Sequence, residues 1–520
     1  MSTPIHKASR LGRGSLISRL LCAAKKELQD VGLGPSIATT SDKDELDALD
    51  RDASEVLSLI RFRRNRLAPI NQLPREVLTL IPDFWDGRER EKIAITLTHV
   101  CRAWREIFVS RASLWTDFHC MDADKTRVYL ERSKSCPINL WLERKHGLFP
   151  NDLFLEIAPH TIGRLKRLSV STTPDHLEDI TKHLTHPAPV LEALTIDGSS
   201  NDFEINSAFT PALFGGDLSS LRELHLHSVR TQLPWRGMVN LTSFSLLRLT
   251  ITVEQLLDFF ESAPRLLEVE LLAAWAFGTQ NGRLVSLAHL RRLHISGSQP
   301  PSLMLNHLLI PVGAKVSTES DLPGPQIDDH LPRSLDNLRN LSDFTEICLH
   351  FEDRSVSMRF TGPNGQVCMT SSSPRPDVTR LALQSLARFD TSKTQRLEII
   401  NGGFFAYEFR SILLSLTNLK TLIVSRCKLT TSFFRGIDPG FSLNHPVPCP
   451  KLEELIFHKD EPFPIEISAE IAEVAARRAS RGAPLKSIRT GNSRKPMTRR
   501  QVDELLRFVE RTEANFDYFG

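Results

Sequence analysis

A phrase of the form Leu-x-x-Leu-x-Leu recurs along much of the chain and restricts its fold more than any other feature. The phrase starts at Leu165, Leu191, Leu221, Leu241, Leu266, Leu290, Leu419 and Leu452. The first six starts are 26, 30, 20, 25 and 24 residues apart, a period typical of stacked structural units. Alternation within the phrase predicts a short strand with one buried face, so the residues that follow must return the chain to the next strand.

Several of these return segments have helical periodicity. In residues 252–264, apolar residues share one helical face and a proline ends the segment. The residues on that face are Val253, Leu256, Leu257 and Phe260. Residues 175–186 and 409–416 have the same character. The expected unit is therefore strand, turn, helix and loop, repeated so that neighbouring units bury a common core.

This unit resembles the leucine-rich repeat. The asparagine or cysteine that regular repeats carry is mostly missing, although Cys427 stands at a suitable place after LIVSR. The resemblance implies an irregular solenoid with one parallel β-sheet over residues 121–465. Residues 311–378 interrupt the period, and their prolines, alternating segments and the turn signal GPNG predict an inserted loop and β-hairpin. Such an insertion could serve recognition or could simply cover an irregular repeat.

A second feature lies ahead of the repeats, in residues 70–115. Pro74 can open a helix, and Pro82 should stop it. After a polar linker, a second helix is expected to carry apolar residues at three- and four-residue spacing. These are Ile93, Leu97, Val100, Cys101, Trp104 and Phe108. About forty-five residues with this much apolar surface make a poor independent domain, so the stretch is expected to need a partner.

The order Leu-Pro-x-Glu-Val-Leu, then Leu-Thr-x-Val-Cys-Arg-x-Trp-Arg, then Leu-Trp resembles the F-box in its fungal form. The resemblance implies a helical module over residues 69–120 that docks on the Skp-type adaptor of a cullin-RING ubiquitin ligase. The expected adaptor contacts are Leu73, Pro74, Val77, Leu78, Ile81, Leu97, Val100, Cys101, Trp104, Leu114 and Trp115. Some of these must instead form the module's own core. Pro82 departs from the family, whose members often have an aromatic residue there. A helical hairpin inside a larger domain is the alternative.

The chain ends have simpler patterns. The start of residues 1–40 is basic and serine-containing, a composition that fits either a disordered tail or a mitochondrial presequence. The rest of the chain points to the cytosol or nucleus, which favours the disordered tail. Residues 41–68 predict an amphipathic helix with Ser41 as its cap and an apolar stripe of about 3.5-residue period. Residues 466–520 predict a helical cap made of segments 467–479 and 499–509, joined by a solvated basic loop.

Composition and motifs exclude several classes of function. The 520 residues are 41% hydrophobic and 24% charged with a net charge of +3, which requires neither nucleic acid nor membrane as a partner. Eight scattered cysteines favour reduced thiols, and no apolar run is long enough to span a membrane. Phosphate-loop, zinc-helix and nucleophile-elbow motifs are missing. The pairs His183/His186 and His225/His227 lack further ligands at metal spacing, so neither a metal nor another cofactor is expected.

Together these patterns predict a mixed α/β protein with an N-terminal F-box module followed by a leucine-rich-repeat solenoid. The expected function is that of a non-catalytic receptor that holds a target protein near the ligase, in the cytosol or nucleus. The alternative is a leucine-rich-repeat scaffold or sensor with no link to a ligase. The identity of the target does not follow from the sequence.

Overall fold

The computed structural model describes most of the chain after residue 40. The described residues are 19, 22–23, 25–26, 40–85, 87–120, 122–143, 151–198, 208–209, 213–231, 237–273, 275–277, 282–320, 327–352, 355–372, 378–404, 406–440, 446–458, 465–491, 500, 503 and 505–514. They divide into a first unit, residues 1–81 with 96–108, and a second unit, residues 82–95 with 109–520. The predicted disordered tail lies almost entirely outside the described residues. In the part described, no helix is both long and apolar enough to cross a membrane.

The first unit is helical. Helix α2 (Thr40–Leu67) confirms the predicted amphipathic helix but begins before Ser41, so Ser41 is not its cap. A short 3-10 turn, η1 (Pro69–Gln72), leads to α3 (Arg75–Leu80), with Pro74 as the residue that caps α3. The helix stops before Pro82, as predicted, and the chain continues as the 3-10 turn η2 (Ile81–Phe84). Proline has no backbone N–H to continue the α-helical hydrogen bonding.

The predicted second helix is two helices. Helix α4 (Gly87–Val100) begins within the expected polar linker, and α5 (Arg102–Ser110) follows after a break at Cys101. The carbonyl of Cys101 accepts the N–H of Arg105 at 2.9 Å and so starts the hydrogen bonding of α5. The apolar residues Val100, Cys101, Trp104 and Phe108 keep three- and four-residue spacing across the break. For that reason the sequence alone indicated one helix.

The second unit is a mixed α/β structure around a sheet of seventeen strands. In order of pairing, they are β1 (Asp117–His119), β2 (Ile138–Glu143), β3 (Leu165–Ser171), β4 (Ala193–Asp197), β6 (Glu223–His227), β8 (Ser243–Leu247), β10 (Glu268–Leu272), β13 (Arg292–Gly297), β15 (Lys315–Ser320), β18 (Gln366–Ser372), β17 (Ser355–Thr361), β16 (Glu346–Phe351), β19 (Arg396–Ile400), β20 (Thr421–Ser425), β21 (Glu454–His458), β22 (Ser487–Gly491) and β23 (Arg511–Ala514). Every pair is parallel except the two made by β17. The predicted parallel sheet is therefore confirmed.

All eight leucine phrases form strands, and each does so in the same way. The N–H of the first leucine bonds to the carbonyl three residues earlier, as Leu221 does to Leu218 at 3.1 Å. All three apolar positions of every phrase are buried. Among the described residues, four of these strands and also β19 are each followed by a non-glycine residue of positive φ. The N–H of that residue donates to a backbone carbonyl at the end of the neighbouring strand. These residues are Ser228, Arg248, Ala273, Asn401 and Arg426, with φ between 48° and 56°.

The interruption at residues 311–378 was predicted as a loop and a β-hairpin inserted within the solenoid. Its strands do not stand apart from the sheet, since β15 to β18 all join it. The expected hairpin exists as β17 and β18 around Gly362 and Gly365, and Gly362 donates to Gly365 at 3.0 Å. Strand β15 lies where a loop was expected, because its sequence KVSTES alternates with only one large apolar residue.

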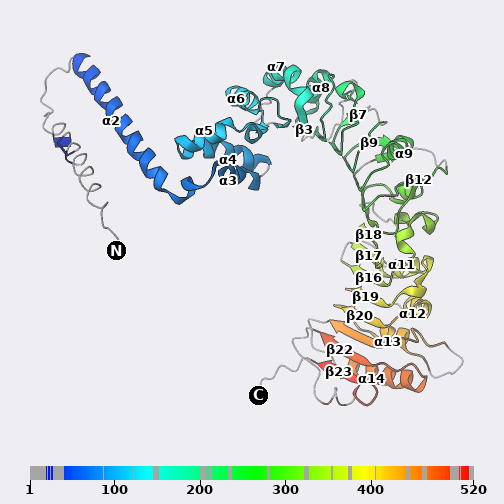
Figure 1. Ribbon diagram of the computed structural model, residues 1–520. Helices are drawn as coiled ribbons and strands as arrows, with labels where there is room; N and C mark the ends of the chain where they lie inside the picture. The colour runs from blue at the N-terminus through cyan, green and yellow to red at the C-terminus, as the bar shows by residue number, and fades with distance from the viewer. Residues whose placement is uncertain are drawn as a thin grey trace, which may run out of the picture. The chain divides into compact units, whose positions relative to one another are not determined.

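Helices return the chain between many of the strands. They are α6 (Ala123–Ser133), α7 (Asn151–Thr161), α8 (Pro174–His183), α9 (Val253–Ser262), α10 (Ser302–Leu305), α11 (Val378–Ser385), α12 (Ala406–Ser415), α13 (Thr431–Ile437) and α14 (Ile465–Ser480). Helix α9 confirms the clearest prediction, with Thr252 and Gln255 forming a capping box at its start. Phe259 of α9 lies 4.2 Å from Phe244 of the sheet, between ring centroids. Figure 1 shows α9, α11 and α12 on the same side of the strands.

The end of the chain differs from the prediction. Helix α14 confirms the first expected helix, but the described part of the second ends in a turn, and β23 follows it at Arg511–Ala514. The predicted solvated basic loop contains β22, and two of its described cations pair with acids on or beside β21: Arg489 with Glu454 at 3.3 Å and Lys486 with Glu453 at 2.9 Å. Arg478 is fully buried and donates to the carbonyls of Pro448 and Cys449, each at 2.8 Å.

Candidate functional site

Exposed apolar side chains are concentrated in one part of the sequence. Of the 22 large apolar side chains that are well exposed among the described residues, 15 lie between Leu49 and Val100. That stretch is one tenth of the chain. Single exposed apolar residues are ordinary on a protein surface, but such a concentration marks an interaction site.

A small core holds the first unit's helices together. Leu78, Leu97 and Trp104 are each no more than 6% exposed. The indole N–H of Trp104 donates to the side-chain oxygen of Asn71 at 2.5 Å, and the Asn71 amide donates to the carbonyl of Asn65 at 2.7 Å. Trp104 also packs edge-on against Phe108, with ring centroids 5.5 Å apart. The structure therefore assigns Leu78, Leu97 and Trp104 to the core instead of to the predicted adaptor contacts.

The start and outer side of α3 present exposed apolar residues. Leu73 and Val77 are 42% and 43% exposed, Leu80 is 56% exposed, and Pro74 is exposed as well. The Pro74 carbonyl accepts the N–H groups of both Val77 and Leu78 at 3.1 Å. Within α3, Leu78 is buried, whereas Val77 and Leu80 stay exposed. We call Leu73, Pro74, Val77 and Leu80 the α3 face.

Four further residues complete the account of the first unit. Val100 is exposed, as the prediction of a contact requires, whereas Ile81 and Cys101 are only half-buried. Cys101 lies at the break between α4 and α5. Ile70 is 47% exposed and was missed as a candidate, although it lies only three residues before Leu73 of the Leu-Pro motif.

The last two predicted contacts lie in the second unit and are buried there. Leu114 and Trp115, in the 3-10 turn η3 (Ala112–Trp115), are at most 1% exposed. The Trp115 ring packs edge-on against Tyr129 at 5.0 Å, and the Arg132 guanidinium lies 4.4 Å from it. Trp115 therefore anchors η3 to α6 and offers no surface to a partner.

An exposed aromatic pair follows Pro82 in the second unit. Phe84 is 84% exposed and Trp85 is 37% exposed. The turn that carries them is held by Asp83, which accepts two hydrogen bonds of 2.9 Å from the Arg111 guanidinium. A fixed turn with exposed aromatic residues is well suited to binding, because aromatic side chains give large contact areas at low entropic cost.

The start of α4 is fixed by a buried polar network. The Glu91 carboxylate is hydrogen-bonded to His119 and paired with Lys125, and the Tyr129 hydroxyl donates to the Glu91 carbonyl at 2.9 Å. Burial raises the pKa of Glu91, but the hydrogen bonds of His119 and Lys125 outweigh this effect and hold the pKa below its usual value. The network ties α4 to β1 and α6.

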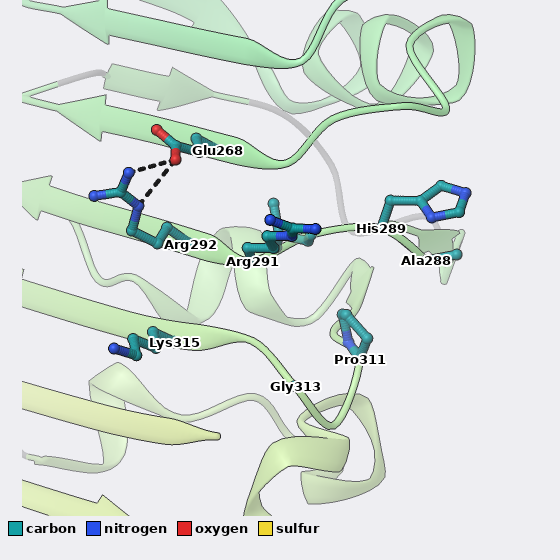
Figure 2. Close-up of a pocket in the computed structure, with 9 residues that line it drawn as sticks. Glu268, Ala288, His289, Arg291, Arg292, Pro311, Gly313 and Lys315 are labelled. Atoms are coloured by element: carbon teal, nitrogen blue, oxygen red, sulfur yellow. Dashed lines mark hydrogen bonds and ion pairs between the residues drawn. The ribbon is translucent and has the colours of Figure 1, made fainter. Parts of the chain in front are cut away.

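A different kind of surface lies on the sheet. A shallow depression of about 690 Å³ opens where β10, β13 and β15 begin, and Figure 2 shows its lining. Arg291, Arg292 and Lys315 supply positive charge, while Glu268 is hydrogen-bonded to Arg292 at 3.1 Å. The depression can accept a carboxylate or phosphate. Because these side chains are exposed to solvent, each pairing would be weak alone, so binding would need several contacts together.

The histidine pairs do not form a metal site. His225 and His227 lie on the half-exposed face of β6, and His227 is bound to Asp197 at 2.9 Å. His183 ends α8. Within the part of the chain that is described, no three His, Cys, Asp or Glu side chains converge as metal ligands would.

Comparison with known proteins gives no independent identification. No protein-family model matches the chain, and no curated protein matches it at a significant level. The site must therefore be interpreted from its own residues.

Proposed function

We propose that this chain is a non-catalytic substrate receptor of a Skp-cullin-F-box ubiquitin ligase. In this proposal residues 69–120 are an F-box that docks on the Skp-type adaptor. Residues 121–465 are a leucine-rich-repeat solenoid that binds a target protein in the cytosol or nucleus. The receptor makes and breaks no bonds, and it raises the effective concentration of the target near the ligase.

The exposed large apolar residues between Ile70 and Val100, eight among the described residues, carry the proposal because they lie within the proposed F-box. A module that had only to close one end of a sheet would bury these residues against it. The α3 face leaves Leu73, Val77 and Leu80 exposed, within the motif that resembles the F-box. Burying a side chain of this size on binding contributes roughly 1.5–3 kcal/mol, so a few of them support a stable complex.

The target surface is proposed to be the polar face of the sheet. Along each strand, alternate residues are buried, and those between them are at least partly accessible in most strands, as in β6 and β10. The basic depression at Arg291, Arg292 and Lys315 lies on this surface. Its charge favours a target segment that carries acidic side chains.

The proposal is tested by titrating the full-length chain with a purified Skp-type adaptor in a calorimeter. We expect a 1:1 complex. Val77→Asp should weaken it at least about tenfold, because the charge would have to be buried in the interface. Val239→Asp is the matched control, since Val239 is 48% exposed but lies far along the sequence, ahead of β8. It should leave the affinity unchanged.

Two outcomes would count against the proposal. If the folded wild-type chain does not bind adaptors, the ligase role is wrong and the alternative of a repeat scaffold or sensor remains. If the adaptor binds both variants as well as the wild type, the α3 face is not the docking surface. Circular dichroism of each variant shows whether the fold is intact.

A further inference from the structure

Helix α2 leaves its large apolar side chains uncovered from Leu49 onward. Every side chain from Leu49 to Arg64 is exposed, although the helix is 28 residues long. A helix in a protein gains most of its stability by packing an apolar face against another element. A helix with this composition is therefore expected to have a partner. Its exposed large apolar residues are Leu49, Val56, Leu57, Leu59, Ile60, Phe62 and Leu67.

The spacing along α2 is that of a coiled coil. Leu49, Ala53, Val56, Ile60 and Leu67 follow one another at intervals of three, four or seven residues, with Arg63 at the remaining position. This is the alternation of a and d positions in a heptad repeat, and it extends over nineteen residues, or about 28 Å of helix. Heptad spacing keeps these residues facing a partner helix, whereas packing on a flat surface does not require this spacing. The expected partner of α2 is therefore another helix.

Charge is divided sharply between the two halves of α2. Residues 40–53 contain six acidic and two basic side chains, whereas residues 54–67 contain one acidic and four basic ones. Two copies side by side in the same direction would place like charges together. In opposite directions, the acidic half of each copy would face the basic half of the other. We infer that α2 pairs antiparallel with α2 of a second copy of this chain, so that the protein self-associates.

One antiparallel alignment satisfies both the apolar and the charged positions. When Val56 packs against Ile60 of the second copy, Leu49 meets Leu67 of the second copy. Leu57 and Leu59 each face their own counterpart across the twofold axis. In the same alignment Asp50 lies opposite Arg64 of the second copy, and Asp52 lies opposite Arg66 of the second copy. The small Ala53 faces Arg63, whose aliphatic stem can lie along the seam. This pairing uses α2 alone and does not depend on adaptor docking.

Self-association is tested by sedimentation of the full-length chain over a wide concentration range. We expect a reversible dimer of twice the chain mass of 58.7 kDa. Ile60→Asp should weaken dimerisation by about tenfold or more, because it places a charge in the apolar seam. Ser58→Asp is the control, since Ser58 lies on the opposite side of the helix and should leave the dimer intact. A monomer at all concentrations, as would follow if residues 1–39 cover α2, overturns the inference, and so does a dimer unaffected by Ile60→Asp.

The direction of pairing has its own test. Under mild oxidation, Leu57→Cys should give a disulfide-linked dimer, because residue 57 meets itself only in the antiparallel alignment. Ile60→Cys should not, because residue 60 meets itself only in a parallel coiled coil. The wild-type chain, treated alike, measures the background from its own cysteines. Linkage through residue 60 and not residue 57 would overturn the antiparallel arrangement. Adaptor binding, measured on the same variants, should remain unchanged.

Discussion

Leu80 and Leu224 show that leucine lies both on the surface and in the core of this chain. Leu80 ends α3 and is 56% exposed, whereas Leu224 lies in the middle of β6 and is fully buried. The phrase around Leu224 is repeated along the second unit, so each strand finds a neighbour with matching residues at the next repeat. The sequence around Leu80 has no such copy.

The difference teaches how apolar residues can be assigned to the fold or to binding. A repeated pattern is satisfied within the chain, because its units stack on one another. An apolar pattern that occurs once, in a segment with only a small core of its own, retains apolar surface. Residues 49–100 contain two such patterns, the coiled-coil seam of α2 and the α3 face. Both proposals made above concern these two surfaces.

The largest expected effect contrasts the two leucines directly. Leu224→Ala should destabilise the sheet by about 2–5 kcal/mol, because it leaves a cavity among buried side chains. Leu80→Ala should change stability by no more than about 0.5 kcal/mol, since its side chain is mainly in water. Hydrogen exchange of the amides in β4, β6 and β8, measured by mass spectrometry, checks both variants. Equal losses of protection would show that Leu80 belongs to a core, and the contrast between the regions would fail.

The sequence predicted the strands well where the phrase is complete and missed them where its first residue differs. Strands β16 and β19 follow the same spacing, but the leading position is Phe344 in the first and Thr394 in the second. Both residues are buried, as the leading leucines are. The physical requirement is a buried side chain at the turn before the strand, and several residue types meet it.

The candidate site was predictable as a stretch but not as a surface. Helical spacing placed Val77 and Leu78 together among the contacts, although they are adjacent residues and the structure exposes one and buries the other. Which of two neighbours is buried depends on how α3 packs against the rest of the first unit, and the local sequence does not show that packing. Trp115 could not be assigned because its packing partner, Tyr129, comes from a later helix.

Acid should lower the free energy of unfolding of the second unit, and this effect is smaller than that of Leu224→Ala. His330, in the 3-10 turn η6 (Ile327–His330) of the second unit, is fully buried, and burial lowers its pKa from the usual 6.5 to about 4. Below pH 6.5 the unfolded chain therefore binds a proton that the folded chain does not. Stability should fall by up to about 3 kcal/mol as the pH drops from 6.5 to 4. Denaturant unfolding of the wild type and of His330→Gln over this range measures the effect.

The substituted chain should lose most of that pH dependence above pH 4. Carboxylates with a lowered pKa, such as Glu91, stabilise the fold while they are charged and lose that contribution mainly below pH 4.5. They therefore contribute little to the change in stability between pH 6.5 and 4.5. An unchanged slope in His330→Gln would show that His330 does not carry the effect.

The smallest effect concerns the residues that end the strands. Arg248 follows β8 with a φ of 53°, a conformation that costs any residue with a Cβ atom free energy and costs glycine none. Its side chain is exposed, so its removal should cost little. Arg248→Gly should therefore be more stable than Arg248→Ala by about 1 kcal/mol, because only glycine relieves the strain. Thermal unfolding of the two variants gives the difference directly, and a less stable glycine variant would mean that the left-handed end of the strand is not strained. Since four other strands end alike, the same pair of substitutions at Ser228 or Arg426 should give the same sign, whereas no position in α3 should respond to glycine in this way.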